Sequence, residues 1–206
     1  MKNIIFDFDG TIANNLAVVV KIISAFAKNY QITQPVTLEI VRSKTLRQLM
    51  KDFHISYIRM LVLLSKAKKE LSHFEREIQP FDGMPELLEA LAQRGFRIYM
   101  LSSNNKKNIY PFLKKFHLAR YFKRIYTTPF PFGKARKLLF LMLKEKLKRE
   151  DTIYVGDEVR DIEAAKKRGI VSVAVTWGFD SETLLRKEHP ELIIRKPAEL
   201  LEKLSQ

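Results

Sequence analysis

The stretch IIFDFDGT, residues 4–11, begins as an apolar run and ends in two aspartates that are one residue apart. Alternate side chains of a regular strand share a face, so we expect Asp7 and Asp9 to point the same way. Two carboxylates held close together repel each other, and a proton or a cation must lie between them. This arrangement suits a site in which one carboxylate attacks and the other moves a proton. A strand that ends in a simple Asp-Gly turn is the plainer interpretation of the same residues.

Three later segments place polar residues at the end of an apolar run or at the start of a helix. Residues 98–105, IYMLSSNN, end in small hydroxyls that can donate to a phosphate or cap the next helix. Lys134 lies at the start of an expected helix, where the helix dipole disfavours a cation unless an anion is near. Residues 152–161, TIYVGDEVRD, contain Asp157 and Asp161 on one side of a starting helix. Taken singly, a cap, a solvated lysine and an acidic helix N-terminus explain these segments.

Together the four segments resemble the motifs of the haloacid dehalogenase superfamily of phosphohydrolases, in that family's order and at its typical separations. Within the superfamily the chain looks like subfamily I, the phosphoglycolate-phosphatase-like branch, which carries a helical cap between the first two motifs. The resemblance implies an α/β fold, in which a doubly wound parallel sheet carries a small helical cap inserted after the first strand. The core would comprise residues 1–14 and 79–206, and the cap residues 15–78.

The resemblance also implies a role for each matching residue. Asp7 would be the nucleophile that forms an aspartyl-phosphate, and Asp9 the general acid and base. The substrate's phosphoryl group would be bound by Thr11, Ser102, Ser103, Asn104 and Lys134. Mg²⁺ would be held by Asp7, the backbone carbonyl of Asp9, Asp157 and, through water, Asp161.

Elementary chemistry suits these roles. Phosphoryl transfer depends mainly on positioning and charge stabilisation, and a phosphate dianion would be repelled by bare carboxylates. Mg²⁺ prefers oxygen ligands and keeps several waters, so few protein ligands suffice. Two positions depart from the family's pattern: Asn14-Asn15 replace a frequent Asp-Ser, and Ala135 replaces a frequent proline after Lys134. Asparagine keeps the hydrogen-bonding capacity but loses a charge, and Lys137 is a weaker candidate for the role of Lys134.

Apolar runs alternate with helical periodicity over much of the chain, which favours a parallel doubly wound sheet. We expect strands at residues 3–8, 97–102, 124–127, 152–155, 172–175 and 192–194. We expect helices at residues 85–94, 106–116, 135–147 and 161–168. Ligands of such sheets bind beyond the carboxyl ends of the strands, where Asp7, Ser102 and Asp157 lie.

Residues 15–78 break this alternation, because they contain no convincing strand and their apolar positions recur at helical spacing. Residues 80–83, PFDG, indicate the turn by which the chain returns to the sheet. We therefore expect a small helical cap over the site. Within it Arg42, Lys44 and Arg47 offer cations that could face the substrate, although a solvated helix face is the plainer interpretation.

The composition narrows the class of protein. The chain has 206 residues, enough for one α/β core with a modest insertion, and no cysteine, which excludes disulfides and thiolate metal sites. The formal net charge of +14 would suit nucleic acid, a membrane surface or anionic substrates. No nucleic-acid motif accompanies the charge, so we expect no specific nucleic acid partner.

Asp7 and Asp9 interrupt the apolar N-terminus, and residues 16–27 are too short to span a membrane. We expect a cytoplasmic protein without a membrane partner.

These observations predict a phosphoric monoester hydrolase that uses Mg²⁺ and an aspartyl-phosphate intermediate. Its substrate would be a small phosphorylated metabolite of the phosphoglycolate or sugar phosphate type, and the protein would be a monomer or a homodimer. A phosphomutase of the same fold is an alternative that needs the cap to retain a bisphosphate intermediate. A basic nucleic-acid-binding or scaffold protein on the same fold is another. Such a protein is expected to lose a catalytic position, whereas Asp7, Asp9, Lys134 and Asp157 are all present.

Overall fold

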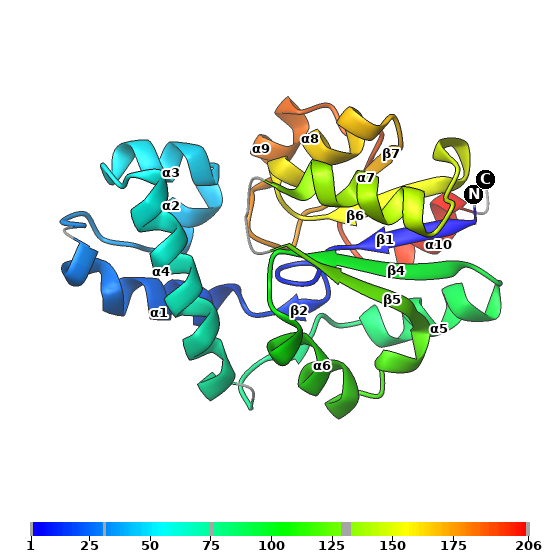
Figure 1. The fold of residues 1–206 in the computed structure, drawn as a ribbon, viewed down its shortest axis with the longest axis horizontal. Helices are drawn as coiled ribbons and strands as arrows, with labels where there is room; N and C mark the ends of the chain where they lie inside the picture. The colour runs from blue at the N-terminus through cyan, green and yellow to red at the C-terminus, as the bar shows by residue number, and fades with distance from the viewer. Residues whose placement is uncertain (1, 31, 75, 129–132, 205–206) are drawn as a thin grey trace.

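The computed structural model describes residues 2–30, 32–74, 76–128 and 133–204. In this part of the chain, a parallel six-stranded sheet has the order β5-β4-β1-β6-β7-β8. Its strands are β1 (Asn3–Phe6), β4 (Arg97–Ser102), β5 (Phe122–Thr127), β6 (Thr152–Gly156), β7 (Val171–Val175) and β8 (Leu192–Ile194). The doubly wound α/β fold predicted from the sequence is confirmed (Figure 1).

Helices cover both faces of the sheet, and the central strand shows why. Ile4 and Phe6 of β1 belong to one buried cluster and Ile5 to another, since successive side chains of a strand point to opposite faces. The first cluster includes side chains of α5 (Met84–Gln93), α6 (Lys106–Lys115) and α10 (Ala198–Leu204). The second includes side chains of α7 (Lys134–Lys144) and α8 (Val159–Arg168). A strand buried on both faces reads as a continuous apolar run.

The first strand is shorter than the sequence predicted. It ends at Phe6, so Asp7 and Asp9 lie in the loop that follows it and not within a strand. The amides of Ile12 and Ala13 both donate to the carbonyl of Phe8 at 2.9 Å, which turns the chain sharply at that point. Gly10 has a φ of +73° in this turn, and a Cβ atom there would lie 2.1 Å from a carboxylate oxygen of Asp157.

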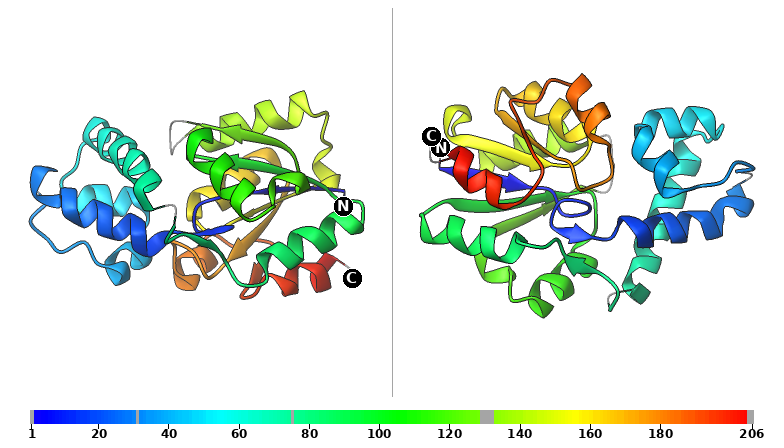
Figure 2. Two further views of the ribbon diagram at one scale, coloured as in Figure 1. Left: turned by 90° about the horizontal axis from the view of Figure 1, so that it is seen from below. Right: turned by 180° about the vertical axis from the view of Figure 1, so that it is seen from behind.

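A short antiparallel pair of strands missed by the sequence prediction follows this turn. β2 (Ala13–Asn14) pairs with β3 (Gln79–Pro80), so the chain leaves the sheet region and returns to it side by side. Between them lie α1 (Leu16–Phe26), α2 (Leu38–Ser43), α3 (Leu46–Asp52) and α4 (Tyr57–Glu70). These helices enclose a hydrophobic cluster of their own. Figures 1 and 2 show them beyond the carboxyl ends of the sheet strands.

Several helix boundaries differ from the expectations. α7 begins at Lys134 itself and ends at Lys144, close to Lys146, whose φ is +53°. α8 begins at Val159, two residues earlier than predicted. α9 (Glu182–Lys187) and α10 were missed, because helices of six and seven residues leave a weak periodic signal. Within the described ranges, no helix has both the length and the apolar character that a membrane crossing requires.

Candidate functional site

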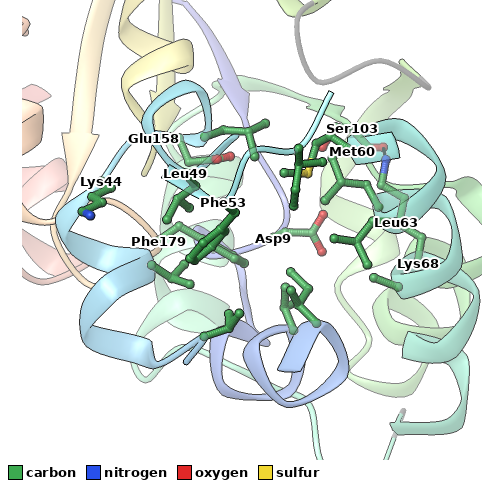
Figure 3. Close-up of a pocket in the computed structure, with 18 of the residues that line it drawn as sticks. Asp9, Lys44, Leu49, Phe53, Met60, Leu63, Lys68, Ser103, Glu158 and Phe179 are labelled. Carbon is green, nitrogen blue, oxygen red and sulfur yellow. Dashed lines mark hydrogen bonds between the residues drawn. The ribbon is translucent and has the colours of Figure 1, made fainter. Parts of the chain in front are cut away.

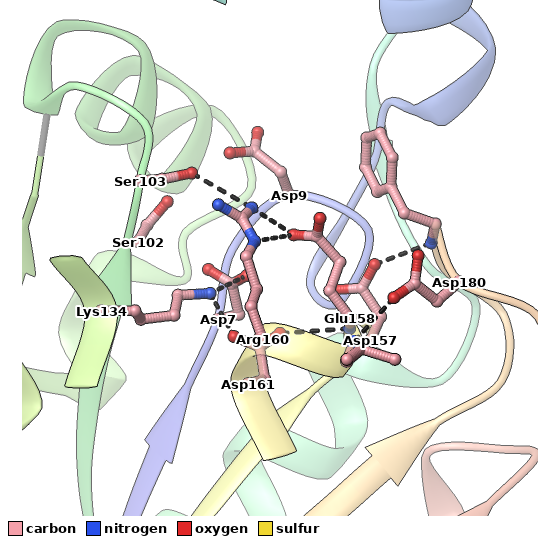
Figure 4. Close-up of polar contacts among 12 residues, drawn as sticks. Asp7, Asp9, Ser102, Ser103, Lys134, Asp157, Glu158, Arg160, Asp161 and Asp180 are labelled. Carbon is pink, nitrogen blue, oxygen red and sulfur yellow. Dashed lines mark hydrogen bonds and ion pairs between the residues drawn. The ribbon is translucent and has the colours of Figure 1, made fainter. Parts of the chain in front are cut away.

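Asp7 lies at the centre of the candidate site. It follows β1 directly, is 1% exposed, and accepts hydrogen bonds from the Phe8 amide (2.7 Å) and from Lys134 Nζ (2.6 Å). Lys134 begins α7, and its ammonium also contacts the carboxylate of Asp161 on α8 (Figure 4). Burial raises the pKa of Asp7 to about 7, although the charge of Lys134 opposes this shift. Burial by itself would lower the pKa of Lys134, but Asp161 and Asp7 outweigh it and raise that pKa.

Asp9 lies on the other side of the turn and faces a cavity. Its Oδ1 accepts hydrogen bonds from the side-chain amides of Asn15 (2.6 Å) and Asn104 (2.8 Å). The two amides fix the orientation of the carboxylate, which lines the cavity. Asn15 is one of the two asparagines that depart from the family's pattern, and it retains the hydrogen-bonding capacity expected of it.

Asp157 directly follows β6, is buried, and accepts a hydrogen bond on each of its carboxylate oxygens. Its Oδ1 accepts from the Thr11 hydroxyl and its Oδ2 from the Phe179 amide, both at 2.7 Å. Burial, followed by the charge of Glu158, raises its pKa well above the ordinary value. Thr11 is completely buried, and its hydroxyl is directed to Asp157.

A cluster of three carboxylates includes one that the sequence analysis missed. Asp7, Glu158 and Asp161 each offer an oxygen within 4.8 Å of the others. Such a donor set fits Mg²⁺, which prefers carboxylate oxygens. Asp157, predicted as a ligand, lies outside this cluster in the structure. The sequence signal for Glu158 was its place directly between two residues already singled out, 157 and 161.

The serines and the asparagine at the end of β4 come together as one segment. Ser102 is completely buried, and its hydroxyl accepts from the Asn104 amide at 2.9 Å. Ser103 borders the cavity, and its carbonyl accepts a hydrogen bond from Lys68 of α4. Asn108 completes the contact by donating to the Lys68 carbonyl at 2.7 Å. The helical segment, residues 15–78, therefore contacts the end of β4 at Ser103, one of the residues predicted to bind phosphate.

The cavity, of about 130 Å³, lies between the helical segment and the sheet. Most of its lining consists of apolar side chains from residues 15–78, with Leu49, Phe53, Met60 and Leu63 among them (Figure 3). Its floor is polar and includes Asp9, Lys68, Ser103, Glu158 and Arg160. A molecule held there would have its charged part against the carboxylates and its remainder against aliphatic side chains.

The three cations suggested for the cap have different surroundings. Lys44 lines the cavity and forms an ion pair with Asp52 at 2.5 Å. Arg42 and Arg47 instead contact residues of the core that surrounds the sheet. Arg42 donates to the Thr176 carbonyl at 2.9 Å, and Arg47 lies 3.7 Å from the Glu163 carboxylate.

The alternative lysine, Lys137, lies over the Phe140 ring at 4.7 Å. Lys134 is therefore the lysine that contacts Asp7. Residue 132, two positions before Lys134, lies outside the described residues.

Asp180 is a second buried acid that the sequence analysis missed. Its Oδ2 accepts from the Val159 amide at 2.6 Å, so it holds the first turn of α8 in place. It follows β7 in a loop, and no local spacing links it to α8. Burial, followed by the charge of Glu158, raises the pKa of Asp180 to about 8.

We expect the metal-free protein to lose stability as the pH rises from 5 to 8. The pKa of Asp180 is 3.8 ordinarily and about 8 in the fold, so the folded state binds more protons than the unfolded state between those values. Melting temperatures in a chelating buffer measure the effect. The Asp180→Asn variant keeps the acceptor for Val159 but cannot ionise, so its melting temperature should fall less over this range. An identical fall in both proteins would contradict the assignment.

Comparison with known proteins identifies the family to which this chain belongs. The family described as haloacid dehalogenase-like hydrolase matches residues 4–175. A phosphoglycolate phosphatase of Synechococcus elongatus is 33% identical, over 100% of this chain and 98% of that protein. A pyrophosphatase of Halalkalibacterium halodurans is 24% identical, over 98% and 96%. The crystal structure of a predicted phosphatase from Clostridium acetobutylicum superposes with a TM-score of 0.85 at 22% identity, over 98% and 97%. The chain therefore belongs to the haloacid dehalogenase-like hydrolases.

Proposed function

We propose that this protein hydrolyses a small phosphate monoester through an aspartyl-phosphate formed on Asp7. The observation that carries the proposal is the presence of two differently held carboxylates, Asp7 and Asp9, in the loop that follows β1. Asp7 is buried against Lys134, a contact that favours its ionised form, whereas Asp9 is held by two amides on a single oxygen. Two neighbouring carboxylates in different environments, one of them against a buried cation, are typical of a nucleophile and a general acid.

The proposed reaction uses these residues in two steps. The Asp7 carboxylate attacks the phosphorus atom, and Asp9 protonates the oxygen of the leaving group as its bond to phosphorus breaks. Asp9 then takes a proton from a water that attacks the aspartyl-phosphate, which restores the Asp7 carboxylate and releases phosphate. Lys134 keeps Asp7 oriented and offsets negative charge. The phosphoryl group would lie against the segment of Ser102, Ser103 and Asn104, while Thr11 holds Asp157.

Mg²⁺ is the cofactor that we propose for this site. The oxygens of Asp7, Glu158 and Asp161 would hold it, with Asp157 and the Asp9 carbonyl as the further ligands predicted from the sequence. When bound, it would neutralise charge on the phosphoryl oxygens and the surrounding carboxylates.

We also propose that residues 15–78 act as a cap. The adjacent strands β2 and β3 connect the helical segment to the core. Lys68 and Arg42 of this segment donate hydrogen bonds to backbone carbonyls of the core. The cavity beneath it would enclose the leaving group and exclude bulk water. Two relatives are named for phosphoglycolate and pyrophosphate chemistry, which supports a small phosphorylated metabolite as the substrate.

We expect hydrolysis of at least one small phosphate ester in the presence of Mg²⁺. A panel that includes phosphoglycolate, sugar phosphates, nucleotides, pyrophosphate and an aryl phosphate would be assayed by release of inorganic phosphate. Activity should vanish in a chelator, return with Mg²⁺ and stay absent with Ca²⁺ alone, because Ca²⁺ takes more ligands at longer distances. Full activity in the chelator would rule out the metal-assisted mechanism. A panel without any hydrolysed ester would rule out the proposed activity.

A further inference from the structure

Arg160 extends from the first turn of α8 into the site. Its Nε donates to Glu158 Oε2 at 2.7 Å, and its Nη2 contacts the same carboxylate oxygen. Nη2 also lies 3.4 Å from the hydroxyl of Ser103 (Figure 4). The charge of Arg160 is among the influences that lower the pKa of Asp7, which places the guanidinium within electrostatic reach of the nucleophile.

Lys134 and Arg160 differ in how an incoming anion can reach them. The Lys134 side chain is 2% exposed, and its ammonium is held between the carboxylates of Asp7 and Asp161. The Arg160 side chain is 18% exposed and lines the cavity beside Asp9 and Ser103. A phosphate in the cavity can therefore approach the guanidinium, as well as Lys68, whereas Lys134 does not line the cavity.

The charges on the floor of the site give that guanidinium a function. The carboxylates of Asp7, Asp157, Glu158 and Asp161 outnumber the nearby cations, which are Lys134, Arg160 and Lys68. A phosphate dianion adds further negative charge. An arginine suits this position because its planar N–H groups match two oxygens of one phosphoryl group, which a lysine cannot do. Glu158 fixes the plane of the guanidinium by holding its Nε edge.

We propose that Arg160 is a phosphate-binding residue that holds two non-bridging oxygens of the phosphoryl group, with Glu158 orienting its guanidinium. The inference rests on the proposed function in one respect, namely that a phosphoryl group is the ligand placed against Asp7. It assigns a phosphate-binding role to a further cation besides Lys134 and gives the Glu158–Arg160 pair a role that the sequence motifs do not reveal.

Calorimetric titration of the full chain with inorganic phosphate, at saturating MgCl₂, tests this role. Arg160→Gln should weaken phosphate binding by about tenfold or more, since a charge-assisted bidentate contact is lost. Arg160→Lys should lose less, because it keeps the charge but not the fork. Lys167→Gln removes an exposed cation from the same helix and should bind phosphate like the wild type. Titration with MgCl₂ alone should give an affinity no weaker in Arg160→Gln than in the wild type, because the loss of Arg160 leaves the carboxylate of Glu158 in place.

Arg160→Gln leaves Glu158 without its ion-pair partner, and the variant can fail to fold for that reason. Arg160→Lys keeps a positive charge beside Glu158, so it serves as the second variant if Arg160→Gln does not fold, and its phosphate affinity should also fall. Unchanged phosphate affinity in either folded variant overturns the proposal. So does a parallel loss of Mg²⁺ affinity in Arg160→Gln, or a wild type that binds no phosphate at millimolar concentration.

The assay of ester hydrolysis separates this inference from the proposed function. A wild type that hydrolyses no ester but binds phosphate through Arg160 would remove the proposed reaction and leave the binding role in place. A wild type that hydrolyses esters, together with an Arg160→Gln variant that binds phosphate normally, would support the proposed reaction and remove the binding role of Arg160.

Discussion

Asp7→Asn is expected to abolish turnover and to leave the protein folded. An amide is a poor nucleophile, and a loss of about 10⁴-fold or more corresponds to roughly 5 kcal/mol of transition-state stabilisation. The fold should tolerate the change because the amide oxygen can still accept from the Phe8 amide, and Lys134 keeps its contact with Asp161. Steady-state kinetics on the best ester of the panel and a thermal melt of the same sample measure both effects.

The matched control for this prediction is Asp82→Asn, the same substitution at an exposed position in the turn after β3. It should retain wild-type kinetics. Trapping supplies an independent check, since acid quenching during turnover should yield phosphorylated wild-type protein and no phosphorylated Asp7→Asn. Activity of Asp7→Asn within about tenfold of the wild type, a barrier change of only ~1.4 kcal/mol, would remove Asp7 from the role of nucleophile.

Lys134→Met is expected to damage both activity and stability. Methionine has a similar length but no charge, so the buried carboxylates of Asp7 and Asp161 lose the cation between them. Breaking a buried ion pair by removing one partner typically lowers the free energy of unfolding by about 3–5 kcal/mol. The catalytic rate should fall by about 10³-fold, as for other lost stabilisers of charge in a transition state. Urea denaturation in a chelating buffer and steady-state kinetics give the two numbers.

A double variant separates these two effects of Lys134. Lys134→Met/Asp161→Asn removes one of the unpaired buried charges and should recover part of the lost stability, whereas activity should stay low. Lys137→Met is the matched control, because its side chain lies over Phe140. A Lys134→Met protein as stable as the wild type would show that the buried contacts of Lys134 contribute little to folding.

The fold was predictable from the sequence because its strands are buried on both faces and end in recognisable polar residues. The register explains why distant motifs meet: Phe6 of β1 is paired with Met100 of β4 and with Val155 of β6. The residues that follow these strands are therefore brought to one edge of the sheet. Local periodicity could not show where β1 ends, because a tight turn after Phe8 overrides the alternating pattern.

The charged partners within the site were less predictable. Glu158 and Arg160 lie inside a motif that was recognised, but in a chain with 37 basic and 23 acidic residues neither stood out by type. Asp180 approaches α8 only because the loop after β7 folds over the helix N-terminus, a contact between residues 21 positions apart. Arg42 likewise reaches across 134 positions to a backbone carbonyl. Contacts of this kind depend on the tertiary arrangement and have no periodic signal.

The pairing of Asn14 with Gln79 has a consequence for how such proteins diversify. The two ends of the helical insertion are neighbours, so the sheet can fold around a closed loop whatever its length, at an entropic cost that grows only slowly with the number of residues. Evolution can thus lengthen, shorten or exchange residues 15–78 as one module and leave the register of the six strands intact. Substrate preference and the hydrolytic machinery are then free to change at separate rates within the same chain.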